Sequence, residues 1–311
     1  MSGPTQRPGG PRRIALVGAR AARGLDEDMP LLEAALAARG IDTEVVDWDD
    51  PQVPWGQFDL ALLRSTWDYT DRLVEFRRWL ERVAVLTRVH NPRALVEWNT
   101  DKHYLRELAV AGLPTVASSF IEPEAAPRPA IERFLAEQTC AEFVIKPAVG
   151  AGSRGARRLA RGQLAQAQAH AAELLKAGRS VLLQPYLEAV DRDGETALLF
   201  FGGQFSHAIR KGPLLQLDAD PTRALFAPEH ITPRTPQPAE QAVGERVMAV
   251  LAASGRVAGP PLYARVDLLR DAHGAPFILE LELAEPSLFL GFAAGAAERF
   301  AEHIAALLNA R

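Results

Sequence analysis

The stretch Phe277–Ser287 reads FILELELAEPS and places two acidic residues, Glu280 and Glu282, between leucines. Side chains two positions apart in a β-strand point to the same face, so both carboxylates share one face and the leucines cover the other. Like charges this close repel, unless water screens them or a cation joins them. Taken alone, the pattern is typical of a solvated acidic face, so the neighbouring sequence has to decide between the two readings.

The preceding stretch, YARVDLL at residues 263–269, reads as a strand joined to FILELEL by the short turn DAHGAP. We expect an antiparallel hairpin in which Asp267 lies opposite Glu280 or Glu282. Three carboxylates on one face would suit a hard divalent cation such as Mg²⁺, which prefers oxygen ligands. The alternative is that Arg265 pairs with one of the glutamates.

Lys146 ends the apolar strand EFVIKPA, where a charge is costly unless it is used. The glycine-rich turn AVGAGSRG follows at once and contains Gly150, Gly152 and Gly155. Glycines allow backbone N–H groups to approach phosphate oxygens closely. The turn lacks the spacing of a Walker loop, so by itself it only suggests phosphate binding.

Short apolar strands alternate with helices along the chain, which indicates an α/β (α+β) fold. We predict a disordered leader at 1–10, an α/β subdomain at 11–95, a second subdomain at 96–188 and a third at 189–311. In the first, strands are expected at 14–18, 41–48 and 58–65, with helices at 29–39 and 71–84. Further on we expect a helix at 101–111 capped by Asn99 or Thr100, a hairpin turning at Gly202 and Gly203, and a proline-rich lid at 212–238.

Composition excludes several classes of protein. The 311 residues carry a formal net charge of −4, which favours neither a nucleic-acid nor a membrane partner. No apolar run reaches the ~20 residues that cross a bilayer. The single cysteine, Cys140, cannot form a disulfide within the chain, so we expect a cytoplasmic protein.

Arg64 ends the apolar strand FDLALL, at an edge of the sheet where ligands usually bind in open α/β folds. Its guanidinium can bind a carboxylate through two hydrogen bonds. We therefore predict that Arg64, Ser65 and Thr66 contact a substrate. The alternative is that Arg64 pairs with a nearby acid while Trp67 packs in a subdomain interface.

Seven motifs together resemble the ATP-grasp ligases of the glutathione synthetase-like branch. In chain order they are NTDK, VIKP with the glycine turn, QPYLE, DGET, HAIRKGP, YARVD and LELELAEPS. The resemblance implies an ATP-grasp fold with a Rossmann-like pre-ATP-grasp subdomain at the N-terminus. Within the branch, LLRSTWDY, NPRALVEWNTDK and ELELAEPSLF are most similar to the O-ureido-D-serine cyclo-ligases of D-cycloserine synthesis.

The resemblance also implies roles for individual residues, with ATP and Mg²⁺ as cofactors. Lys102 and Lys146 would hold ATP phosphates under the loop that contains Gly150, Gly152, Ser153 and Gly155. Adenine would be read by Gln184 and the backbone of Tyr186 and Leu187, and the ribose by Glu195. Arg210, with Lys211 as a second candidate, would stabilise the reacting oxygens, and Mg²⁺ would be bound by Asp267, Glu280 and Glu282. In many relatives the position of Glu282 is an asparagine, so this chain carries an additional negative charge there.

The implied activity is ATP-dependent joining of a carboxylate to an amine through an acyl phosphate, on a small amino-acid-like substrate. The two groups could belong to one molecule, which would close a ring. Two other readings stay open, a catalytically silent ATP-binding regulatory protein and a small-molecule kinase. Relatives are often dimers or tetramers, so a homo-oligomer is also open.

Overall fold

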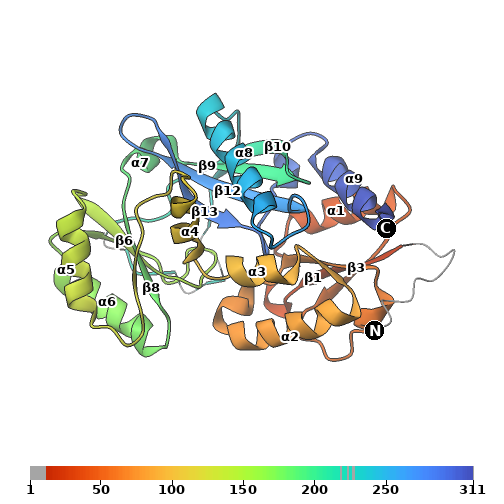
Figure 1. Ribbon diagram of the computed structural model, residues 1–311, viewed down its shortest axis with the longest axis horizontal. Coiled ribbons are helices and arrows are strands. Elements are labelled where there is room, and N and C mark those ends of the chain that lie inside the picture. The colour runs from red at the N-terminus through yellow and green to blue at the C-terminus, as the bar shows by residue number, and fades with distance from the viewer. Residues whose placement is uncertain (1–11, 218, 223, 226–227, 311) are drawn as a thin grey trace.

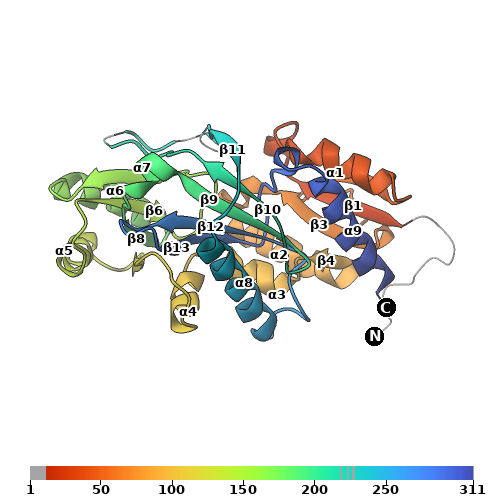
Figure 2. The same cartoon turned by 90° about the horizontal axis from the view of Figure 1, so that it is seen from above.

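The computed structural model describes residues 12–217, 219–222, 224–225 and 228–310, so the predicted leader at 1–10 lies outside the described residues. Three β-sheets lie side by side along the molecule, with helices packed against them (Figures 1 and 2). We call them the N-terminal sheet (order β2-β1-β3-β4), the distal sheet (β5-β8-β6-β7) and the central sheet (β11-β10-β9-β12-β13). The predicted α/β (α+β) fold class is confirmed.

The N-terminal sheet is entirely parallel. Its strands are β1 (Arg13–Gly18), β2 (Asp42–Asp47), β3 (Leu60–Ser65) and β4 (Arg88–His90), and its helices are α1 (Asp28–Ala37) and α2 (Leu73–Leu86). The central strand β3 is buried along its whole length, as expected where elements cover both faces of a parallel sheet. The predicted strands and helices of this part are confirmed. The short strand β4 was missed because its sequence, RVH, carries little apolar signal.

The distal sheet is antiparallel, and two helices cover it. The strands are β5 (Ser119–Ile121), β6 (Glu142–Pro147), β7 (Arg157–Ala160) and β8 (Val181–Pro185), and the helices are α5 (Pro127–Glu137) and α6 (Leu164–Lys176). Sequence reasoning missed β7, because its sequence reads as part of a basic turn.

The central sheet is antiparallel and carries the acidic strand. Its strands are β9 (Glu195–Phe201), β10 (Gln204–Lys211), β11 (Ile231–Arg234), β12 (Tyr263–Arg270) and β13 (Pro276–Glu282), and nearby helices are α7 (Ala189–Asp193), α8 (Pro238–Ala253) and α9 (Ala296–Asn309). The predicted hairpin is confirmed, since Gly202 and Gly203 connect β9 to β10 with φ angles of 55° and 77°. The register places Asp267 opposite Glu280, also as predicted.

The segment after β4 differs from the prediction. It forms two short helices, α3 (Arg93–Asn99) and α4 (Tyr104–Val110), and neither Asn99 nor Thr100 caps the second one. Instead, the buried Asn99 amide donates to the Leu281 carbonyl at 2.7 Å and accepts from the Leu283 N–H at 2.7 Å. The reason is physical, because β13 is an edge strand and its free backbone groups need partners.

The N-terminal and central sheets share one hydrophobic core. Helices α1 and α9 lie beside each other (Figures 1 and 2). Apolar side chains of β1, β9 and α9 belong to one buried cluster. Phe300 of α9 stacks on Phe201 of β9 at 4.6 Å between ring centroids. This packing holds the acidic face of the central sheet against the N-terminal part of the chain. Among the described residues, no helix is long and apolar enough to cross a membrane.

Candidate active site

A cavity of about 460 Å³ opens where all three sheets meet. It is lined by side chains from distant parts of the sequence. Most of the predicted site residues are among them: Lys102, Lys146, Gly150, Gly152, Ser153, Gln184, Tyr186, Leu187, Glu195, Lys211, Glu280 and Glu282. The described part of the proline-rich segment also contributes, through Leu214, Leu215, Leu225, Glu229 and Ile231.

Two lysines from different elements converge on Glu280. Lys102 Nζ lies 2.7 Å from a Glu280 carboxylate oxygen, and Lys146 Nζ lies 3.9 Å from the other. Burial alone would raise the pKa of Glu280, but the two ammonium groups outweigh it and lower that pKa. Burial lowers the pKa of Lys146, and Glu280 partly offsets this. Two ammonium groups beside one carboxylate leave a net positive charge, to which an anion could bind.

The glycine-rich turn lies beside these lysines. Lys102 Nζ donates to the Gly150 carbonyl at 2.6 Å. Gly152 and Ser153 both adopt positive φ angles, of 60° and 59°, so this turn has an unusual backbone at the cavity wall. Gly155 does not line the cavity; its φ angle of 71° is one that residues with a Cβ rarely adopt, so the glycine serves the backbone of the turn.

The predicted adenine contacts are met only in part. Gln184 lines the cavity and donates to Ser118 Oγ at 3.0 Å. The backbone N–H of Tyr186 is already used, because it donates to the Glu142 carbonyl at 2.9 Å. In this arrangement it cannot also donate to a base, so any backbone donor would have to be Leu187.

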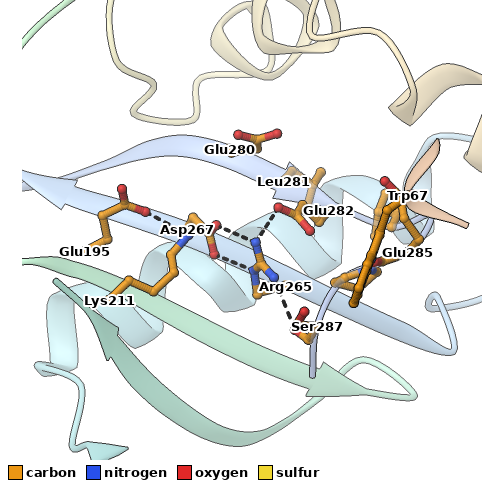
Figure 3. Close-up of polar contacts among 12 residues, drawn as sticks. Trp67, Glu195, Lys211, Arg265, Asp267, Glu280, Leu281, Glu282, Glu285 and Ser287 are labelled. Atoms are coloured by element: carbon orange, nitrogen blue, oxygen red, sulfur yellow. Dashed lines mark hydrogen bonds and ion pairs between the residues drawn. The ribbon is translucent and has the colours of Figure 1, made fainter. Parts of the chain in front are cut away.

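Acids and cations alternate across the central sheet (Figure 3). Lys211 Nζ bridges Asp267 at 2.7 Å and Glu195 at 2.9 Å, and Arg265 joins Asp267 to Glu282. Burial would raise the pKa of Asp267, but Arg265 and Lys211 lower it to about 2. Burial raises the pKa of Glu282 to about 7, although Arg265 opposes this. Glu195 is thus occupied by Lys211, which argues against its predicted role with ribose.

The predicted magnesium ligands are close in register but are not arranged as a ready-made metal site. Within the described residues, no group of three or more His, Cys, Asp or Glu side chains is placed to hold a metal ion. Each of Asp267, Glu280 and Glu282 instead contacts a lysine or an arginine. The donors are the carboxylate oxygens that Mg²⁺ prefers, so the residues fit the ion chemically, and binding would require these ion pairs to rearrange.

The catalytic prediction for Arg210 is wrong in this geometry. Its guanidinium Nε donates to the Asp193 carbonyl at 2.8 Å, and the residue does not line the cavity. Neighbouring residues on a strand point to opposite faces, so Arg210 and Lys211 cannot both face the site. Lys211 is the one that does.

The substrate prediction for Arg64, Ser65 and Thr66 is also not met, because none of the three lines the cavity. Arg64 is fully buried and lies 3.7 Å from Asp26 and 3.4 Å from Asp28. The alternative reading, an ion pair with a nearby acid, therefore describes Arg64. Trp67 lines the cavity and donates to the Glu285 backbone carbonyl at 3.0 Å.

Sequence reasoning left several lining residues without a role. The most prominent are Arg265, Glu285 and Asp26. Arg265 was considered only as a partner for a glutamate, which it is, but it also faces the cavity. Glu285 could have been found from its place three residues after Glu282 in the same acidic motif. Asp26 lies in a loop that carried no signal.

Comparison with known proteins identifies relatives of this chain. Residues 14–91 match the family model of the D-cycloserine synthetase DcsG N-terminal domain. The chain is 40% identical to the cycloserine biosynthesis protein DcsG of Streptomyces lavendulae over 95% of this chain and 99% of that protein. It is 24% identical to D-alanine–D-alanine ligase of Dichelobacter nodosus over 88% of this chain and 82% of that one.

Solved structures extend the likeness. The crystal structure of D-cycloserine synthetase DcsG superposes with a TM-score of 0.90 at 39% identity, covering 96% of this chain and 100% of that one. The ATP-grasp ligase PsnB, solved with Mg and ADP, shares the fold with a TM-score of 0.62 at 21% identity, over 95% of this chain and 98% of that one. This chain therefore belongs to the DcsG family of ATP-grasp ligases.

Proposed function

We propose that this ATP-dependent ligase joins a carboxylate to a nitrogen within one small amino-acid-like molecule, closing a ring as in the conversion of O-ureido-D-serine. The observation that carries the proposal is the convergence of Lys102, Lys146, Lys211 and Arg265 on one cavity that also holds Glu280. The similarity to D-cycloserine synthetase along nearly the whole chain supports the ring-closing form of the reaction.

The reaction has two steps. A substrate carboxylate oxygen attacks the γ-phosphorus of ATP, the bond from that phosphorus to the bridging oxygen of ADP breaks, and an acyl phosphate forms. The substrate nitrogen then attacks the carbonyl carbon, the carbon–oxygen bond to phosphate breaks, and the nitrogen releases its proton to the surrounding water. The products are the cyclised amide, ADP and phosphate, so no phosphoryl group stays on the product.

The residues of the chain would contribute mainly charge and position, as is usual in phosphoryl transfer. Lys102 and Lys146 would bind the phosphates beside the turn at Gly150. Lys211 and Arg265 would face the carboxylate that becomes activated. Both cations contact the Asp267 carboxylate at the side of the cavity.

Magnesium fits this scheme, with Glu280, Glu282 and Asp267 as the residues that would hold it. When bound, the ion neutralises charge on the phosphates. Leu214 and Leu215 of the proline-rich segment line the cavity and would help to keep water from the acyl phosphate. We place the protein in the cytoplasm, where a lone free cysteine such as Cys140 is ordinary.

The decisive experiment incubates the purified protein with ATP, Mg²⁺ and O-ureido-D-serine, and follows ADP and product mass together. We expect substrate-dependent ADP formation and a product that carries no phosphoryl group. Lys146→Ala should abolish turnover and weaken ATP binding, while a matched change at exposed Lys176 should do neither. A phosphorylated product would instead indicate a kinase. ATP binding without ADP release in the presence of D- and L-amino acids would indicate a silent regulatory protein.

A further inference from the structure

We propose that Glu285 binds the positively charged amino group of the substrate and so selects free amino acids over their N-acylated analogues. This inference rests on the ligase function proposed above and assigns the substrate amino group to one end of the same cavity.

Glu285 lies in the loop after β13, and its side chain lines the cavity although only 8% of the residue is exposed. Trp67 fixes the loop by donating to the Glu285 backbone carbonyl. The buried Tyr69 hydroxyl interacts with the Glu285 carboxyl group. Figure 3 shows Glu285 beside Trp67, on the far side of Glu282 from Lys211. The carboxyl group is therefore held at a defined place.

Glu285 differs from Glu195, Glu280 and Glu282 in having no lysine or arginine of the described residues within ion-pair distance. Glu280 contacts Lys102, Glu282 contacts Arg265, and Glu195 contacts Lys211. In the part of the chain that the structure describes, no lysine, arginine or histidine nitrogen forms an ion pair with Glu285 within 4.0 Å. Burial and the neighbouring Glu282 raise the pKa of Glu285 to about 8. A carboxylate in this position is stabilised by a cation that the protein does not itself supply.

A second acid points to the same end of the cavity. Asp26 is 8% exposed and lines the cavity, and its Oδ2 atom is buried without a hydrogen-bond partner among the described residues. Arg64 lies between Asp26 and the loop that carries Glu285, because it is 3.7 Å from Asp26 and donates to the carbonyl of Pro286 at 3.2 Å. Asp26, whose only cation in the described chain is Arg64, and Glu285 thus adjoin one region, whereas Lys211 and Arg265 lie at the other.

This polarity fits an amino acid lying along the cavity. Its carboxylate would face Lys211 and Arg265, and its ammonium group would face Glu285. Trp67, Phe289 and Phe292 also line the cavity and offer apolar surface to the Cα and the side-chain carbon of such an amino acid. An N-acylated analogue has no positive charge at this position, so binding it would leave the Glu285 carboxylate unpaired.

The test compares O-ureido-D-serine with its N-acetyl derivative in the wild type and in Glu285→Gln. We expect the variant to raise the KM for the free amino acid about 10- to 100-fold, the range of a charge-assisted hydrogen bond. The KM for ATP should stay within about twofold. The preference for the free amine, measured as the KM for the N-acetyl derivative divided by the KM for the free amino acid, should fall by the same factor. An unchanged preference overturns the inference, as does a loss confined to the KM for ATP or Mg²⁺.

Two controls keep the outcomes separable. Glu298→Gln removes a carboxylate from the exposed surface of α9 and should change neither KM. If Glu285→Gln does not fold, Glu285→Asp keeps the charge on a shorter side chain; it should raise the KM while keeping the amine preference, and an unchanged KM would contradict the inference. Calorimetric binding of both ligands in the presence of ADP repeats the comparison without turnover. Failure of the proposed function would appear as a wild type that forms no ADP, whereas failure of this inference leaves the wild type active.

Discussion

Replacing Asn99 by alanine tests how the acidic strand is held in place. The side-chain amide of Asn99 supplies hydrogen-bond partners to the free edge of β13. It donates to the Leu281 carbonyl and accepts from the Leu283 N–H. Glu282 lies between these two residues, and Glu280 lies just before them. The substitution leaves one backbone donor and one backbone acceptor without their partner.

Each buried polar group left unsatisfied costs about 1–3 kcal/mol, so the two together give a range of about 2–6 kcal/mol. The truncated side chain leaves room that a water molecule could enter and bond, which favours the lower end. We therefore expect Asn99→Ala to lower the free energy of unfolding by about 2–3 kcal/mol. Because β13 would be less well fixed, we also expect kcat to fall about tenfold or more.

Equilibrium unfolding in urea measures the first effect, and steady-state ADP formation measures the second. Asn309→Ala, at the exposed end of α9, is the matched control and should change stability by less than about 0.5 kcal/mol. A loss of stability below that value for Asn99→Ala would refute the reasoning on the two hydrogen bonds. A large loss of stability with an unchanged kcat would show that Asn99 does not position the acidic residues.

Three further predictions follow from individual contacts. Lys211→Ala should reduce kcat by at least about 100-fold, whereas Arg210→Ala should leave it within about threefold, because only Lys211 lines the cavity; equal losses in the same ADP assay would contradict the assignment of faces. Arg64→Ala should lower the free energy of unfolding by about 3–5 kcal/mol, since it leaves Asp26 and Asp28 without their buried cation; a stable variant with only a raised substrate KM would instead restore the contact with substrate. Burial lowers the pKa of His207 to about 4, so the folded protein keeps it neutral while the unfolded chain takes up a proton below about 6.5. The free energy of unfolding therefore contains a stabilising contribution from His207 above pH 6.5, and this contribution is lost as the pH falls toward 4. In urea titrations over this range, the free energy of unfolding of His207→Gln should fall by roughly 3 kcal/mol less than that of the wild type.

The hairpin that carries the acidic residues could be predicted because its signals are local. Alternating side chains and a short turn are enough to place Asp267 opposite Glu280. Lys146 could be predicted for a similar reason, since a charge at the end of an apolar strand such as β6 needs a use. These features depend on a few adjacent residues, and the structure retains them.

The errors arose where one residue type serves two purposes. An asparagine before a helical pattern can cap the helix, but the same amide can pair with an exposed strand edge, as Asn99 does. An arginine at the end of a strand can bind a ligand or an acid of its own chain. Arg64 binds Asp26 and Asp28, which lie just before and at the start of α1, far from it in sequence. Only the tertiary structure decides between such alternatives.

The balance of charge in the cavity connects the site residues to the ligands they would take. More carboxylates than cations line it. Burial first, and neighbouring acids second, raise the pKa values of Glu282 and Glu285. ATP would add several further negative charges to the same space. Binding is then favourable only if positive charge enters with the nucleotide, and Mg²⁺ at the acidic strand and an ammonium group at Glu285 are two such sources. The acid at Glu282 thus makes the cavity more dependent on cations from outside the chain. On this reasoning, Glu282→Asn should bind ATP with a weaker requirement for Mg²⁺ than the wild type, and an unchanged magnesium dependence in calorimetric titrations would contradict it.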